Sequence, residues 1–303
     1  MDARITKQRL ANMLAYDWLK IVGVIALAAL FFSMFFLMIG TRPTDGQKFY
    51  VYAYSDIKVG GDFNRLADEM ESKNVFGYDI LDVSCEGFTS TGLYGNSVFT
   101  ARRAVGEGRV MFMSDKRTVD SEGNEKSELL GFLENKGQSR ESFNLFKDPQ
   151  AFMEDCKSYL EEFFGEDLKG ELNRDKARET FLKRNKKDAR FRTDKKRESG
   201  ILLEEARLEK LKEDYLYFTS QIGQKLEYVS YTSNIKTHTV AFSMKELNLT
   251  KLVYYTEKQE DGEVQTNSDI VLCLFNNGER EGDLKYETVN FLAYLVRTYG
   301  TQE

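Results

Sequence analysis

The sequence predicts an α/β protein that is attached to a membrane by one N-terminal helix. Three observations support this prediction. An uncharged run of twenty residues, from Ile21 to Gly40, stands near the start of a chain of 303 residues. Strand and helix patterns then alternate from Lys48 to Met113, which is typical of a parallel or mixed sheet covered by helices. A helical middle segment follows, and the chain returns to strands before a last helix.

The apolar run predicts a helix that crosses a bilayer. At about 1.5 Å per residue it is roughly 30 Å long, the thickness of the hydrocarbon core. More cations precede the run than follow it closely: Arg4, Lys7, Arg9 and Lys20 against Arg42 and Lys48. The positive-inside rule therefore favours a cytoplasmic N-terminus and an extracytoplasmic C-terminal domain. A cleaved signal peptide is the alternative, but it normally has a shorter apolar stretch and small residues at its cleavage site, whereas this run ends Met38-Ile39-Gly40-Thr41.

These patterns divide the chain into four parts. We expect a cytoplasmic tail at 1–17, a transmembrane helix at 18–40, a linker at 41–48 and an extracytoplasmic domain at 49–303. Within that domain we expect an α/β part at 49–145, a helical segment at 146–223, and return strands with a terminal helix at 224–303. Its length is enough for one domain of two lobes or for two small domains.

Periodicity and turn residues predict the individual elements of the domain. The predicted strands are 49–54, 78–83, 109–113, 225–231, 239–242, 252–258, 263–266 and 269–275. The predicted helices are 62–73, 97–106, 149–165, 201–218 and 286–299. Residues 120–124 resemble a calcium loop in only three ligand positions, so we interpret them as a polar hairpin or loop.

Composition argues against an enzyme and against a bound metal or cofactor. The chain has three cysteines with no zinc spacing and one histidine, His238. It contains no phosphate-binding loop, dinucleotide fingerprint, nucleophile elbow or zinc-protease motif. Ser55-Asp56-Ile57-Lys58 and Ser233-Asn234-Ile235-Lys236 match S-x-x-K by chance, because the other elements of a penicilloyl-serine enzyme are missing.

A basic stretch in the helical segment is the strongest charge feature. Between Lys169 and Arg197 there are thirteen Lys or Arg against five Asp or Glu. Nucleic acid is an improbable partner for an extracytoplasmic domain, so anionic lipid headgroups or cell-wall polymers are the better candidates. The competing interpretation is a solvated pair of helices. The candidate surface-binding residues are Lys183, Arg184, Lys186, Lys187, Arg190, Arg192, Lys195, Lys196 and Arg197.

The order of elements resembles that of type II extracytoplasmic solute-binding proteins, the receptors of ABC importers. The stretch Phe99 to Met113 (FTARRAVGEGRVMFM) is similar to their helix that ends at small residues before a strand entering the cleft, and Asp269 to Asn277 (DIVLCLFNN) is similar to their C-terminal region. The resemblance implies a two-lobed, periplasmic-binding-protein-like mixed sheet that closes around a small polar ligand. It also implies a transporter permease, or another envelope complex, as partner. The chain departs from the family in its shorter domain, its membrane helix, and its lack of any tryptophan beyond Trp18 for stacking a sugar.

A ligand cleft of this kind would lie at the carboxyl ends of the strands. That rule selects residues after each of the first three predicted strands, together with one arginine that could pair with an anionic group. The candidate ligand-binding residues are Ser55, Asp56, Ser84, Glu86, Arg102, Ser114 and Asp115. Each of them is also a residue type common in loops and helix caps.

Two functions follow from these expectations. The first is a membrane-anchored receptor for a small polar solute that works with a transporter or envelope complex. The second is a non-catalytic envelope scaffold or interaction protein, which contacts lipid, wall polymer or a protein partner through its basic helical segment.

Overall fold

The computed structural model describes residues 7–39, 43–54, 57–88, 95–119, 121, 123, 125–135, 145–233, 236–259 and 262–300. They form two compact units, 1–42 and 43–303. The first contains helix α1 (Lys7–Ile39), which begins eleven residues before the predicted membrane helix. Within it, Trp18–Phe35 is long and apolar enough to cross a membrane, and none of that stretch is buried against protein. Its large apolar side chains, such as Leu27 and Phe31, are exposed.

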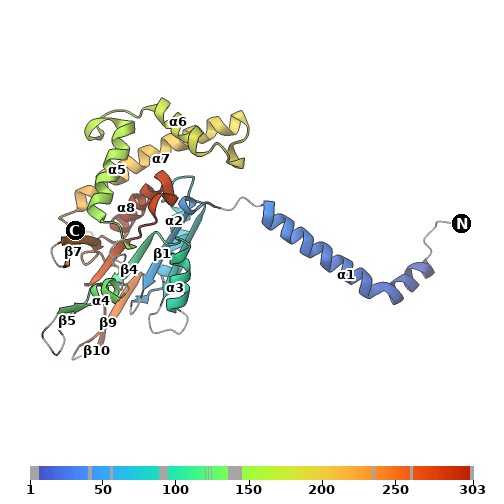
Figure 1. The fold of residues 1–303 in the computed structure, drawn as a ribbon, viewed down its shortest axis with the longest axis horizontal. Coiled ribbons are helices and arrows are strands. Elements are labelled where there is room, and N and C mark those ends of the chain that lie inside the picture. Colours follow the sequence, from blue (N-terminus) through green and yellow to red (C-terminus); the bar gives the residue numbers. More distant parts are fainter. Residues whose placement is uncertain are drawn as a thin grey trace. The chain divides into compact units, whose positions relative to one another are not determined.

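The second unit is built on a mixed sheet, as the sequence predicts, and this sheet has six strands (Figure 1). The sheet has the order β3-β1-β4-β11-β8-β7, in which β1 is parallel to β3 and β4 and the remaining neighbours are antiparallel. The strands are β1 (Lys48–Tyr54), β3 (Asp82–Phe88), β4 (Val110–Ser114), β7 (Glu227–Ser233), β8 (Lys236–Ser243) and β11 (Ile270–Leu274). Small sheets flank it, formed by β2 (Lys58–Val59) with β9 (Val253–Gln259) and β10 (Gly262–Thr266), and by β5 (Arg117–Val119) with β6 (Glu125–Ser127).

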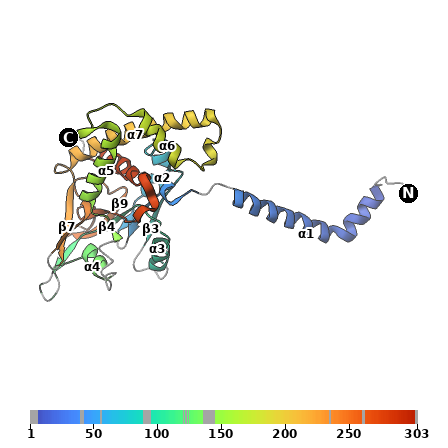
Figure 2. The ribbon, with the colours of Figure 1, turned by 45° about the horizontal axis from the view of Figure 1, so that its top comes forward.

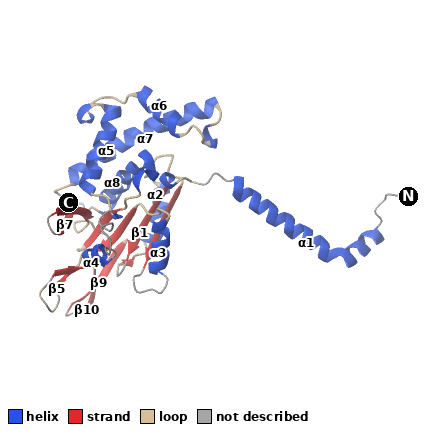
Figure 3. Ribbon diagram, viewed as in Figure 1, coloured by secondary structure: helices blue, strands red, loops and turns tan. Residues whose placement is uncertain are grey.

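Alternating side chains on the six-stranded sheet supply two hydrophobic cores. On β1, Phe49, Val51 and Ala53 face one core, and Tyr52 and Tyr54 face the other. The first core is covered by α2 (Leu66–Ser72), α5 (Pro149–Phe164), α7 (Asp194–Gln221) and α8 (Glu287–Tyr299). The second is covered by α3 (Gly95–Ala104) and α4 (Glu128–Asn135). The sheet is therefore enclosed between two helical layers, of which the layer over the first core is the larger (Figure 3).

The helical segment forms a hairpin that packs on the larger layer. Helix α6 (Arg174–Arg184) is followed by the short 3-10 helix η5 (Ala189–Phe191) and by α7, whose first half lies against α6 in both views (Figures 1 and 2). Thr193 caps α7 by accepting a hydrogen bond from the Lys196 N–H at 3.4 Å. Helix α7 thus begins seven residues before the predicted helix at 201–218.

The two-lobed arrangement is not confirmed, because residues 43–303 form one compact unit around one six-stranded sheet. The predicted strand at 78–83 is wrong in position, since β3 begins at Asp82. Residues 78–79 form a turn whose polar groups bind the α6–α7 hairpin. Strands β5 and β6, on either side of the polar segment at 120–124, pair in antiparallel register, and residues 120, 122 and 124 lie outside the described residues.

Candidate functional site

The predicted ligand residues do not form one cluster. Ser55 and Asp56 lie outside the described residues. Ser84 and Glu86 are residues of β3 and not of a loop after it, because β3 starts four residues later than the predicted strand. Ser114 ends β4 and Asp115 follows it. In the sheet, β1 lies between β3 and β4, so these residues belong to two separate places.

The predicted ligand residues on β3 belong to an ion-pair cluster at the edge of the sheet. Arg102 on α3 approaches Glu86 at 2.8 Å and Glu107 at 3.8 Å, and the Ser84 hydroxyl donates to Glu86 at 3.4 Å. Burial alone would lower the pKa of Arg102, but the charge of Glu86 helps to raise it above its ordinary value. All three side chains of the ion pairs remain about a quarter to a third exposed. Lys48 lies 3.6 Å from Glu107 as the second cation, so the two carboxylates at this surface are balanced by two cations.

The predicted ligand residues at the end of β4 lie beside a tyrosine of β7, which hydrogen-bonds one of them. The Tyr231 hydroxyl hydrogen-bonds Asp115, and lies 2.8 Å from the Ser127 hydroxyl. The Ser114 hydroxyl accepts the Lys116 N–H at 3.2 Å. Burial raises the pKa of Tyr231, and the hydrogen bond to Asp115 raises it further. Tyr231 therefore connects β7 both to Asp115, at the end of β4, and to Ser127 of β6, whereas Ser114 makes a local turn contact.

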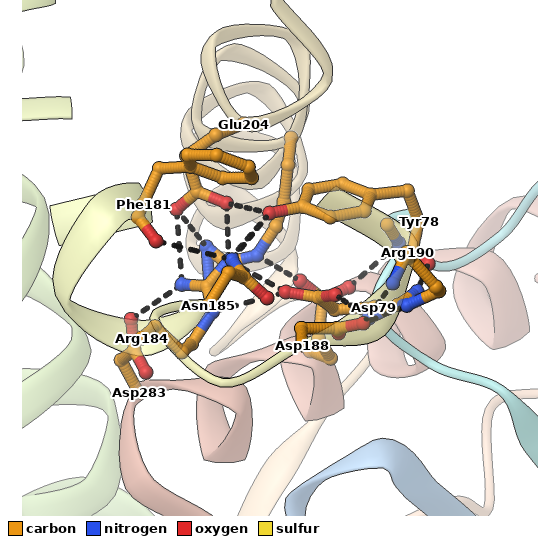
Figure 4. Close-up of polar contacts among 12 residues, drawn as sticks. Tyr78, Asp79, Phe181, Arg184, Asn185, Asp188, Arg190, Glu204 and Asp283 are labelled. Carbon is orange, nitrogen blue, oxygen red and sulfur yellow. Dashed lines mark hydrogen bonds and ion pairs between the residues drawn. The ribbon is translucent and has the colours of Figure 1, made fainter. Parts of the chain in front are cut away.

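The predicted surface-binding residues differ in where their side chains point, because some are directed into the protein and others into solvent. Arg184 and Arg190 point inward and are engaged by acidic side chains (Figure 4). Their placement corrects the expectation that all nine cations face outward. Arg197 pairs with Asp194 at 3.0 Å. The other six are exposed and, among the residues that the structure describes, have no ion-pair partner. We call these six the basic face: Lys183, Lys186, Lys187, Arg192, Lys195 and Lys196.

The inward arginines belong to a network that fixes the turn between α6 and α7. Asp79, which is 1 % exposed, receives Arg184 at 2.7 Å on one oxygen and Arg190 at 2.6 Å on the other. Arg184 also reaches Asp283 at 2.7 Å, and Glu204 at 3.1 Å. We call this set the anchor network: Tyr78, Asp79, Arg184, Arg190, Glu204, Arg207, Asp283 and Glu287.

Glu204 connects the anchor network to the interior. It is fully buried on α7, accepts a hydrogen bond from the Tyr78 hydroxyl at 2.9 Å, and lies 3.5 Å from Arg207. Arg207 in turn pairs with Glu287 at 2.9 Å, with both side chains fully buried. Burial alone would raise the pKa of Glu204, but the charges of Arg207 and Arg184 outweigh it and hold the pKa below its ordinary value. The same balance lowers the pKa of Asp283.

The sequence did contain a signal for this network. On the predicted helix at 201–218 an apolar stripe recurs at spacings of three, four or seven residues: Ile201, Leu208, Leu211, Tyr215 and Phe218. Glu204 and Arg207 fall within this stripe. Charged residues are rarely buried unless they are paired. A charge in the middle of an apolar stripe therefore indicates a buried ion pair, although its partners cannot be identified from the helix alone.

A hollow of about 820 Å³ lies beside the basic face, between α6, η5 and the start of α7. Its cationic lining includes Lys186, Lys187 and Arg192, and its apolar lining is Phe181, Leu182 and Phe191. Three carboxylates also line it, and each is paired with an arginine: Asp188 with Arg190, Asp194 with Arg197, and Glu198 with Arg178. Phe181 and Phe191 pack edge to face with ring centres 5.0 Å apart, directly behind the charges. This arrangement can hold an anionic group against the cations and an apolar group against the rings.

Within the described residues, no group of three or more His, Cys, Asp or Glu side chains is placed to hold a metal ion. Comparisons of the chain with protein-family models, with curated proteins and with solved structures give no match.

Proposed function

We propose that the chain is a single-pass membrane protein whose extracytoplasmic unit is a non-catalytic interaction module, and that the basic face binds an anionic surface of the cell envelope. The observation that supports this proposal is the division of the cations. The anchor network neutralises Arg184 and Arg190 and fixes the turn, while six neighbouring cations are exposed and form no ion pair with any residue that the structure describes.

The charges are sufficient for such binding. Each Lys or Arg near an anionic surface contributes about 1 kcal/mol. Because the α6–α7 hairpin is held by buried ion pairs, little ordering of its backbone is needed when the surface binds. Salt should weaken the interaction, since exposed charges are screened within about 8 Å at physiological ionic strength.

The test uses the full chain in nanodiscs of zwitterionic lipid, presented to immobilised glycerol-phosphate polymer and, separately, to vesicles containing an anionic lipid. We expect binding to at least one of them, weakened roughly tenfold or more by reversal of three charges, Lys186→Glu, Lys187→Glu and Arg192→Glu. The matched control reverses three exposed lysines elsewhere, Lys169→Glu, Lys245→Glu and Lys251→Glu, and should bind as the unaltered chain does. Equal loss in both variants would show a net-charge effect and refute a role for the basic face.

The small-solute receptor implied by the resemblance stays a prediction. The feature that favours it is the surface cluster of Glu86, Arg102 and Glu107, whose charges a polar solute could displace and replace. A ligand that binds only the folded state raises the melting temperature. Screening sugars, amino acids and short peptides against the full chain in detergent should then give at least one stabilising compound, whose effect is lost in Arg102→Ala.

A further inference from the structure

The basic face lies at the end of the unit where the chain enters from α1. Strand β1 begins at Lys48, opposite Asp82 of the parallel strand β3, and the Leu81 N–H donates to the Gln47 carbonyl at 2.8 Å. The anchor network binds Asp79, three residues before β3, so the α6–α7 turn is fixed to this same edge of the sheet. The predicted ligand residues Ser114 and Asp115, by contrast, lie at the carboxyl end of β4, where Ser114 is the last residue of the strand and Asp115 follows it.

The entry segment is itself fastened to the unit. Buried Arg109 donates to the carbonyls of Gly46 and Lys48 at 3.1 and 3.0 Å, and pairs with Glu281 at 2.9 Å. Glu281 belongs to the 3-10 segment η6 (Gly278–Tyr286), which also supplies Asp283 to Arg184. The segment η6 therefore connects the place of chain entry with the anchor network through direct contacts.

Chain length limits how far this edge can lie from a bilayer that α1 spans. The apolar run ends at Gly40, and the first turn of the folded unit, η1 (Asp45–Gln47), begins five residues later. Five residues reach at most about 18 Å when fully extended. The headgroup layer occupies roughly 5–8 Å of that distance. The entry edge is thus confined to the neighbourhood of the headgroups.

Exposed leucines accompany the cations on the same hairpin. Leu182 and Leu202 are 38 % and 65 % exposed. Leu202 stands seven residues after Lys195 and therefore on the same face of α7. Leu182, on α6, lines the hollow together with Lys186. A soluble polyanion offers no apolar surface against which exposed leucines could be buried. Segments that bind a membrane surface, in contrast, combine Lys and Arg with Leu side chains that enter the boundary between headgroups and acyl chains.

We infer that the basic face, with Leu182 and Leu202, is a footprint that rests on the anionic phospholipid of the membrane that α1 crosses. This inference rests on the proposed function and names the surface that is bound. The cations contact the lipid phosphates, and the leucines lie below them at the level of the upper acyl chains. One tethering helix and one surface footprint together would hold the unit close to the membrane in a fixed orientation.

The test places a spin label on the full chain in nanodiscs. In a Cys85→Ser background, Leu202→Cys is labelled and compared with Leu216→Cys, which is another exposed leucine of the same helix, at 48 % against 65 % for Leu202. The two positions are fourteen residues, or about 21 Å, apart along α7. In discs containing phosphatidylglycerol we expect the label at 202 to lose access to a water-soluble relaxation agent and gain access to oxygen, while the label at 216 stays in water. In discs of phosphatidylcholine alone, and with Lys186→Glu, Lys187→Glu and Arg192→Glu, both labels should stay in water.

The outcomes separate the two proposals. A label at 202 that is as accessible to water as that at 216 in anionic discs would overturn the footprint. If the basic face still binds glycerol-phosphate polymer in a charge-dependent way, the proposed function stands and its target is a polymer instead of lipid. If charge reversal changes neither lipid nor polymer binding, both proposals fail.

Discussion

The substitution Glu204→Gln should destabilise the extracytoplasmic unit far more than its small chemical change suggests. The Glu204 side chain is fully buried and lies against Arg184, Arg207 and Tyr78. The glutamine amide keeps the shape of the side chain but removes its charge. Its NH2 group, which is a hydrogen-bond donor, would also have to face the donor groups of Arg184, Arg207 or Tyr78. Arg207, also fully buried, would keep only Glu287 as counter-charge.

The expected cost is about 3–5 kcal/mol, the usual result of breaking a buried ion pair from one side. For a unit of this size that lowers the melting temperature by roughly 10 °C. Thermal unfolding should be followed by near-ultraviolet circular dichroism of tyrosine. Trp18, the chain's single tryptophan, lies in α1 and does not report on residues 43–303.

The adjacent residue provides the control. Glu205 is on the same helix and its side chain is 16 % exposed, but among the described residues its ion pair is a long one, 3.7 Å to Arg174, whose side chain is 77 % exposed. Glu205→Gln should therefore cost no more than about 1 kcal/mol. If the two variants unfold within 1–2 °C of each other, the buried network does not contribute the stability that its geometry implies, and the reasoning is refuted.

Three further predictions concern packing, pH and topology. Gly200→Ala should loosen the α6–α7 hairpin at a cost of about 1–3 kcal/mol, since a Cβ there would come within 2.8 Å of Phe191. Faster hydrogen exchange confined to 174–203 would show this loosening, and unchanged exchange would contradict it. The pKa values of Glu204 and Asp283 are lowered in the folded state, so their ionised side chains contribute to the free energy of unfolding at neutral pH. This contribution is lost as the pH falls below about 4.5 and the two carboxylates become protonated. The melting temperature of Glu204→Gln should accordingly depend less on pH below 5 than that of the unaltered chain. A cysteine introduced by Thr44→Cys should react with an impermeant reagent from outside the cell, and reaction from the cytoplasmic side alone would reverse the proposed topology.

Local patterns were enough to predict most of the fold. The apolar run, the strand and helix alternation and the buried strand at 269–275 all depend on neighbours in sequence, and the structure confirms a mixed sheet with one apolar N-terminal helix. The second strand was misplaced because Tyr78, Ile80 and Leu81 resemble a strand in composition, whereas the less regular Asp82–Phe88 pairs with β1. Strand pairing is decided by long-range hydrogen bonds and side-chain contacts, which a short pattern does not contain.

By itself the sequence determined that a membrane-length helix precedes an α/β unit with a strongly basic helical segment. Only the tertiary structure decided which cations of that segment are available to a partner. Arg184 and Arg190 belong to the same charge run as Lys186 and Arg192, yet they turn inward because Asp79, Glu204 and Asp283 converge on them from distant parts of the chain. Burying a charge requires a partner, and the partner's position is set by the fold and not by the run of charges.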